Sequence, residues 1–148
     1  MGLSKFGIQP HQIIFINLVK QKDILWATEE ALKCKSLSGV ISELEEITFA
    51  QSQRLQLTVE KSKVTGFILR TQTDRISATA CAARWQIKPL ASENKDSLPG
   101  VGFAKWQVDL LKVRNGNTAS CVITYQNGQL TVLENENTYP FTHQAIGS

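Results

Sequence analysis

The sequence has few of the residue types that build metal and redox sites. It holds three cysteines among 148 residues, Cys34, Cys81 and Cys121, and two histidines, His11 and His143. No two cysteines are spaced as Cys-x-x-Cys, which disfavours a zinc site and thioredoxin-type redox chemistry. Three widely separated cysteines are typical of free thiols in a reducing compartment. We therefore expect no bound metal and a cytoplasmic location.

Long apolar runs and a strong excess of one charge are also missing. No stretch of about 18 uncharged apolar residues occurs, so no membrane span is expected, and the first residues do not resemble a secretory signal. The 16 Lys and Arg against 13 Asp and Glu leave a formal net charge of +3. That excess is too small to indicate a nucleic-acid-binding protein by itself. With 42% hydrophobic residues, the chain has the composition of one globular domain.

The sequence contains no recognised phosphate-binding or nucleophile motif. None of its nine glycines is followed by Lys and then Ser or Thr, so a P-loop is absent from these residues. The pair Gly100 and Gly102 lies between expected antiparallel strands and opens no helix, which excludes a dinucleotide fingerprint. No Gly-x-Ser-x-Gly elbow occurs. We therefore expect no catalytic site and no cofactor.

The first half of the chain alternates between apolar runs and helical periodicity. The nearly continuous apolar run at 12–18 predicts a buried parallel strand, and Asp23 is expected to cap the helix that follows it. A second strand is expected at 40–44 and a third at 66–70. Thr48 and Gln51 form a capping-box pattern that predicts a helix running to about Lys61.

The second half changes to a period of two. Apolar and polar residues alternate over 80–90 and 105–114 and less regularly over 119–125 and 130–133, which predicts antiparallel strands. Asn-Gly pairs at 115–116 and 127–128 predict hairpin turns. The expected fold class is α/β: a short, mainly parallel sheet flanked by two helices and extended by antiparallel strands. We expect a single domain over 1–133, with its βαβαβ part at 1–76, its antiparallel part at 77–133, and a polar tail at 134–148.

A few side chains stand out as candidate functional groups. Glu43, Glu45 and Glu46 lie at the C-terminal end of the second strand, where doubly wound folds place their sites. A solvated strand-to-helix loop is the favoured interpretation over a magnesium or general-base role. The alternation around Trp85 places it in the core. Trp26 lies at the edge of its helix's apolar face, where packing is favoured over a partner contact.

The ordered set of these segments resembles the RecA-like family, and within it the ImuA branch of accessory factors of damage-induced mutagenesis. The resemblance covers about residues 5–130. It is carried by the stretches 6–16, 26–34, 39–44, 54–57, 66–70, 82–87, 99–102 and 106–110.

The resemblance implies roles for individual residues. Glu43 falls at the position of the Walker B aspartate of RecA, and Arg70 falls near the position of the glutamine that senses the terminal phosphate. At both positions the residue type differs from that of the ATPase. The stretch 71–79 takes the place of a longer DNA-contacting loop, so Arg70, Arg75 and Arg84 are candidate DNA contacts, with Arg84 otherwise on the solvated face of its strand. The segment that would carry the P-loop precedes residue 1, which implies a core without motor chemistry.

Two hypotheses follow. The first is a non-catalytic interaction module that binds protein partners of a lesion-bypass complex, a polymerase-like subunit and RecA, with Trp26 as a candidate contact. The alternative is a single-stranded DNA-binding or nucleotide-handling domain that requires a missing N-terminal P-loop half. An enzyme using Glu43 and Glu45 is least favoured. An open sheet edge would also favour a homodimer.

Overall fold

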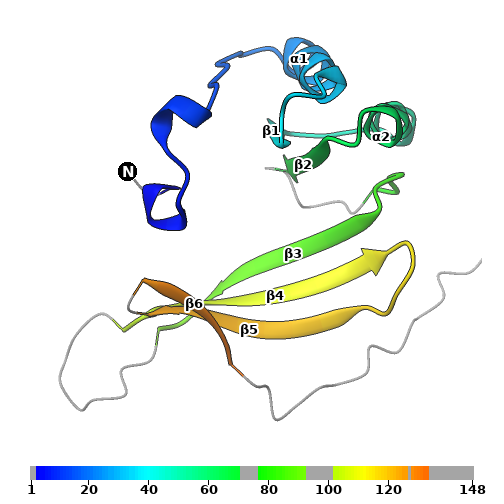
Figure 1. Cartoon of the computed structure of the whole chain (residues 1–148). Coiled ribbons are helices and arrows are strands. Elements are labelled where there is room, and N and C mark those ends of the chain that lie inside the picture. Colours follow the sequence, from blue (N-terminus) through cyan, green and yellow to red (C-terminus); the bar gives the residue numbers. More distant parts are fainter. Residues whose placement is uncertain (1–2, 71–76, 93–101, 127, 134–148) are drawn as a thin grey trace, which may run out of the picture. The chain divides into compact units, whose positions relative to one another are not determined.

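The computed structural model describes residues 3–70, 77–92, 102–126 and 128–133, and it divides the chain into two compact units (Figure 1). The N-terminal unit comprises residues 1–81 and the C-terminal unit residues 82–148. The expected polar tail at 134–148 lies outside the described residues. Each unit is described by itself below, and the expectation of one domain over 1–133 stays a prediction.

The N-terminal unit begins with two short 3-10 turns, η1 (Leu3–Phe6) and η2 (Pro10–Gln12). The strand predicted at 12–18 is wrong, because residues 13–19 form neither helix nor strand. Apart from the half-buried Ile13, the apolar side chains of this stretch are exposed, Phe15 by 83%. A continuous apolar run indicates that its side chains tend to be buried, but a strand also needs a neighbouring strand to satisfy its backbone hydrogen bonds. No neighbouring strand for this stretch exists among the described residues.

The first helix, α1 (Gln21–Lys33), begins with Lys20 rather than Asp23 at its N-cap. Asp23 lies in the first turn instead, where a carboxylate complements the partial positive charge of the helix N-terminus. The helix presents Thr28 and Leu32 to the interior. The hydroxyls of Thr28 and Ser42 form a hydrogen bond at 2.7 Å, which fixes the helix against the neighbouring strand.

A strand–helix–strand unit follows: β1 (Gly39–Leu44), α2 (Phe49–Ser62) and β2 (Thr65–Arg70). β1 and β2 pair in parallel, from Gly39 opposite Thr65 to Leu44 opposite Arg70, which confirms the expected parallel sheet. The predicted capping box is also confirmed. The Gln51 N–H donates to Thr48 Oγ1 at 3.2 Å, and the Thr48 N–H donates to Gln51 Oε1 at 2.9 Å.

Both helices cover one face of the β1–β2 sheet and enclose a small apolar core. Its buried members are Leu32, Leu44, Ile47, Leu55 and Val64. Gly66 allows the close approach of α1 to the sheet, because a Cβ at this position would lie 3.1 Å from Leu32 Cδ2. The core therefore lies between the sheet and the two helices.

The C-terminal unit is a four-stranded antiparallel sheet in the order β3 (Ala83–Leu90), β4 (Ala104–Val113), β5 (Ala119–Gln126) and β6 (Gln129–Leu133). The predicted strands and both hairpin connections are confirmed. One correction concerns the sheet as a whole. In the described residues these strands form a sheet of their own and do not extend the parallel one.

The two faces of this sheet differ in polarity. One face carries the row Ile87, Val108 and Cys121, and a second row that includes Trp106, Ile123 and Val132. The opposite face is mainly polar: it carries Gln107, Asp109, Ser120 and Thr124, together with the apolar pair Val122 and Leu133.

Trp85 lies on the apolar face but is 59% exposed, so its predicted core position is wrong, whereas Trp106 is half-buried. Arg84 is half-buried rather than on a solvated face, next to a register shift between Arg84 and Trp85. The periodicity places Trp85 on the correct face. That face lacks a covering layer among the described residues of the unit, and this accounts for the exposure.

Candidate functional site

The face of the β1–β2 sheet opposite the helices has no cover in the part of the N-terminal unit that the structure describes. Ile41 is 72% exposed, and its register partner Phe67 is 55% exposed. Leu69, 49% exposed, pairs with the exposed Glu43 on the same face. We call these four residues the uncovered face. Neighbouring large apolar side chains left in solvent are typical of a surface that docks onto another protein.

The edges of the same sheet are also open. Within the described residues, β1 and β2 pair only with each other, so each presents one row of backbone N–H and C=O groups without a strand beside it. Such edges pair readily with a further strand. The open edges and the uncovered face are therefore both suited to a protein partner.

The acidic residues after β1 lie in a solvated loop, as the favoured interpretation expected. Glu45 and Glu46 are exposed, and the Glu45 N–H donates to Gln21 Oε1 at 3.1 Å, so α1 holds the start of this loop. No group of three His, Cys, Asp or Glu side chains suited to a metal ion occurs in the ranges that the structure describes. Glu43 itself lies on the uncovered face.

The three candidate DNA contacts belong to different parts of the chain: Arg70 to the N-terminal unit, Arg84 to the C-terminal unit, and Arg75 to the residues outside the described ranges. Arg70 ends β2, and its Nη1 donates to Ser77 Oγ at 3.3 Å, which ties the strand end to the chain after residue 76. Arg75 lies outside the described residues. Arg84 belongs to β3 in the other unit. Their role as a joint DNA contact stays a prediction.

Trp26 is exposed on α1. Its side chain is 63% accessible, so the interpretation of packing within the core is wrong. A large exposed aromatic side chain is a frequent anchor in protein interfaces. The exposure of Trp26 therefore favours its candidate role as a partner contact.

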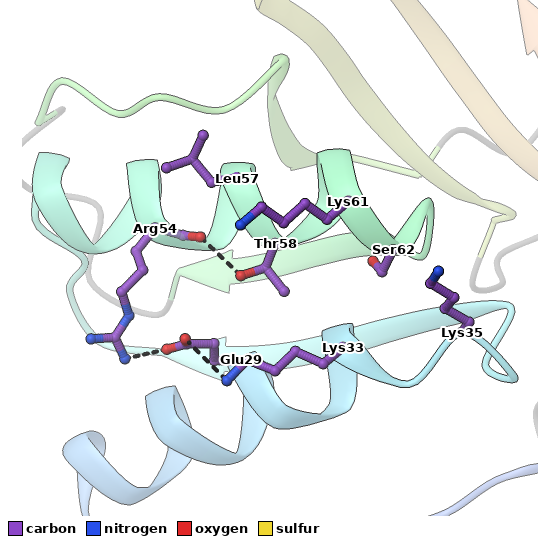
Figure 2. A pocket seen from close by; sticks show the side chains of 8 residues that line it. All are labelled: Glu29, Lys33, Lys35, Arg54, Leu57, Thr58, Lys61 and Ser62. Carbon is purple, nitrogen blue, oxygen red and sulfur yellow. Dashed lines mark hydrogen bonds and ion pairs between the residues drawn. The ribbon is translucent and has the colours of Figure 1, made fainter.

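A hollow of about 480 Å³ lies between α1 and α2, on the helical side of the unit (Figure 2). We call it the basic groove. Its lining residues are Glu29, Lys33, Lys35, Arg54, Leu57, Thr58, Lys61 and Ser62. The carboxylate of Glu29 forms ion pairs with Arg54 and, at 3.4 Å, with Lys33. Lys33 also contacts Glu30 at 2.6 Å, and that hydrogen bond raises the pKa of Lys33 above its usual value.

The C-terminal unit contains a buried polar cluster on the polar face of its sheet. Ser120 Oγ donates to Asp109 Oδ1 at 2.7 Å, and Gln107 Nε2 donates to the same oxygen at 2.9 Å. The hydrogen bond from Ser120, followed by that from Gln107, lowers the pKa of Asp109. These bonds satisfy a carboxylate that burial would otherwise penalise. We assign the cluster a structural role.

Comparison with known proteins gives one kind of relative. Protein ImuA of Caulobacter vibrioides, in each of two strains, is 25% identical to the chain over 134 residues. The chain is similar to Protein ImuA. The matched region is 84% of this chain and 55% of the relative, so the chain spans about half the length of the curated relatives it matches. No family model and no solved structure matches the chain.

The similarity to Protein ImuA confirms the resemblance to the ImuA branch inferred from the sequence. Sequence reasoning missed the basic groove, although its signal was present in part. Arg54 and Lys61 are seven residues apart, which places them on one side of a helix. Lys33 ends the preceding helix, and Lys35 follows it by two residues. Only the packing of α1 against α2 brings these two sets together.

In the described residues, no helix is both long and apolar enough to cross a membrane.

Proposed function

We propose that this chain is a non-catalytic accessory module of damage-induced, error-prone lesion bypass and that it acts by binding protein partners. The partners proposed are a polymerase-like subunit and RecA. The similarity to Protein ImuA supports the cellular context. The uncovered face is the observation that carries the docking role, because it presents Ile41, Phe67 and Leu69 to solvent on one side of a small sheet.

The energetics of the uncovered face favour docking. Fully burying an aliphatic or aromatic side chain contributes about 1.5–3 kcal/mol relative to leaving it exposed. Three such side chains on adjacent strands supply a compact apolar centre, and the exposed Glu43 beside them supplies a polar rim. That arrangement has the anatomy of a protein interface, with an apolar core and polar surroundings.

The test is a binding measurement with one variant and a matched control. The purified chain is titrated against RecA and against the lesion-bypass polymerase-like subunit of the same organism. Phe67→Ser removes the centre of the uncovered face. Phe49→Ser removes a phenylalanine of nearly equal exposure, 54% against 55%, from the first residue of α2.

We expect a complex with at least one of the two proteins, weakened by about tenfold or more by Phe67→Ser, since tenfold corresponds to ~1.4 kcal/mol. Phe49→Ser should leave it unchanged. The absence of a complex with both proteins, or specific micromolar binding of Mg-ATP, would contradict the proposal. The alternative function is tested alongside. Salt-dependent binding of single-stranded DNA that is lost in the Arg70→Ala, Arg75→Ala double variant would favour a DNA-binding domain.

A further inference from the structure

We infer that the basic groove binds a short acidic segment of a partner protein, with carboxylates at Lys35 and Lys61 and an aliphatic side chain against Leu57. The inference takes its partner class, a protein, from the proposed function. It rests otherwise on the residues of the groove. These lie on the helical side of the unit, whereas the uncovered face lies on the opposite side of the β1–β2 sheet.

Charge is the first argument. Four cationic side chains and one carboxylate line the groove, while the whole chain has 16 Lys and Arg against 13 Asp and Glu. The local excess of positive charge in this one hollow therefore equals that of the entire sequence. A concave surface lined by one sign of charge concentrates its field and attracts ligands of the opposite sign.

The four cations are not equivalent. Glu29 engages Arg54 and Lys33, and its own side chain is only 12% exposed, so this trio holds α1 and α2 together. Lys35 and Lys61 form no ion pair with the described residues, and both are exposed. These two ammonium groups are therefore available to a ligand, and two carboxylates would neutralise them.

The remaining lining residues favour a peptide over a nucleic acid. Leu57 is half-exposed within the groove, where an aliphatic side chain of a ligand would cover it. Single-stranded nucleic acids are bound by aromatic platforms combined with cations along the backbone, and the lining of this groove contains no aromatic residue. Proteins with steep salt dependence on DNA make about 6–10 phosphate contacts, many more than two free lysines provide.

Trp26 extends the argument beyond the groove. It precedes Glu29 by three residues and Lys33 by seven, so the three side chains share one side of α1. An exposed tryptophan one turn along the helix from the groove would anchor the flanking part of the same segment. The inference thus accounts for the exposure of Trp26.

The test uses a fluorescein-labelled twelve-residue peptide of glutamate and leucine, the same peptide with glutamine for glutamate, and a labelled twelve-nucleotide oligothymidine. The groove variant is Lys35→Glu, Lys61→Glu. The control is Lys20→Glu, Lys88→Glu, which makes the same change of charge at two exposed lysines outside the groove. Circular dichroism melting checks that each variant folds.

We expect saturable binding of the acidic peptide that weakens between about 50 and about 300 mM salt, because exposed ion pairs are screened. The groove variant should weaken binding by about tenfold or more, and the control by no more than about twofold. Leu57→Ala should also weaken it. Equal losses in the groove variant and the control would overturn the inference, and so would undiminished binding of the glutamine peptide. If oligothymidine binds more tightly than the acidic peptide and the groove variant abolishes that binding, the ligand of the groove is a nucleic acid and the inference is overturned.

Phe67→Ser separates this inference from the proposed function, because that variant should leave peptide binding unchanged. If a Phe67-dependent complex forms but the groove variant still binds the peptide, only the inference about the groove fails. If the peptide binds at Lys35 and Lys61 but neither protein partner binds the chain, the proposed function fails and the groove remains.

Discussion

Within the described residues, the two units of this chain differ in whether they bury large apolar side chains, although both bury polar ones. In the N-terminal unit, α1 and α2 cover one face of the β1–β2 sheet, and five apolar side chains are buried between them. In the described part of the C-terminal unit, the buried side chains are Asp109 and Thr124, and the apolar face of the sheet keeps Trp85 and Ile87 exposed. A sheet buries an apolar face only when a second layer lies on it.

The two units also differ in the apolar surface that each leaves exposed. The N-terminal unit has a completed core on one side and the uncovered face on the other. The C-terminal unit is an antiparallel sheet, and no described residue of the unit covers its apolar face. The hydrogen bonds to Asp109 help to hold its strands together. Apolar residues that are regularly placed but left in solvent favour a chain that acts by docking.

The largest expected effect comes from the apolar core. Leu44→Ala should destabilise the N-terminal unit by about 2–5 kcal/mol, because Leu44 is only 2% exposed and its truncation leaves a cavity. The matched substitution Ile87→Ala, at an exposed site of the C-terminal unit, should cost less than about 1 kcal/mol. Hydrogen exchange resolves the amides of each unit. Equal losses of protection from both variants would contradict the difference between the units.

A smaller effect is expected from the polar cluster. Ser120→Ala removes a hydrogen bond to the Asp109 carboxylate and should destabilise the C-terminal unit by about 1.5 kcal/mol at pH 7. Because the pKa of folded Asp109 is lowered, its contribution is complete above the unfolded pKa of about 3.9 and is lost as the pH falls through the folded pKa.

The pH dependence can be measured by urea unfolding between pH 7 and pH 2. The Asp109→Asn variant should lack the component of acid destabilisation below about pH 4 that the wild type shows. Glu43→Gln, which alters an exposed carboxylate outside the cluster, serves as the control and should retain it. Identical acid profiles for wild type and Asp109→Asn would show that the cluster does not stabilise the charged carboxylate.

The smallest of these effects concerns the start of α2. Thr48→Ala removes the side-chain acceptor of the capping box and should cost about 1 kcal/mol. Thr48→Ser keeps an acceptor oxygen and should lose only part of that stability. Chemical denaturation followed by helical circular dichroism compares the two. If both variants lose the same amount, the hydrogen bond from Gln51 is not the source of the effect.

The sequence predicted what depends on neighbouring residues. The capping box of Thr48 and Gln51, the strands β1 and β2 and the hairpin turns were recognisable, because each is encoded within a few residues. The strand predicted at 12–18 and the core position predicted for Trp85 are wrong for one shared reason. Periodicity shows which side chains tend to be buried, but it does not show whether a partner strand or a covering layer is present.

The candidate sites were harder to predict, because they join residues that are distant along the chain. Glu29 and Arg54 are 25 residues apart, and only the packing of the helices brings their side chains into one groove. The uncovered face needs the parallel register that sets Ile41 opposite Phe67. Asp109 accepts a hydrogen bond from Ser120 on the neighbouring strand. The alternation of the sequence indicates only that both positions are polar.

Hydrogen–deuterium exchange of the full chain with and without a bound partner tests the docking role most directly. The amides of β1 and β2, Gly39–Leu44 and Thr65–Arg70, should gain protection when RecA or the polymerase-like subunit is added. Addition of Mg-ATP should leave them unchanged. Protection induced there by Mg-ATP, or unchanged exchange in both strands with the two proteins at saturating concentration, would contradict the account.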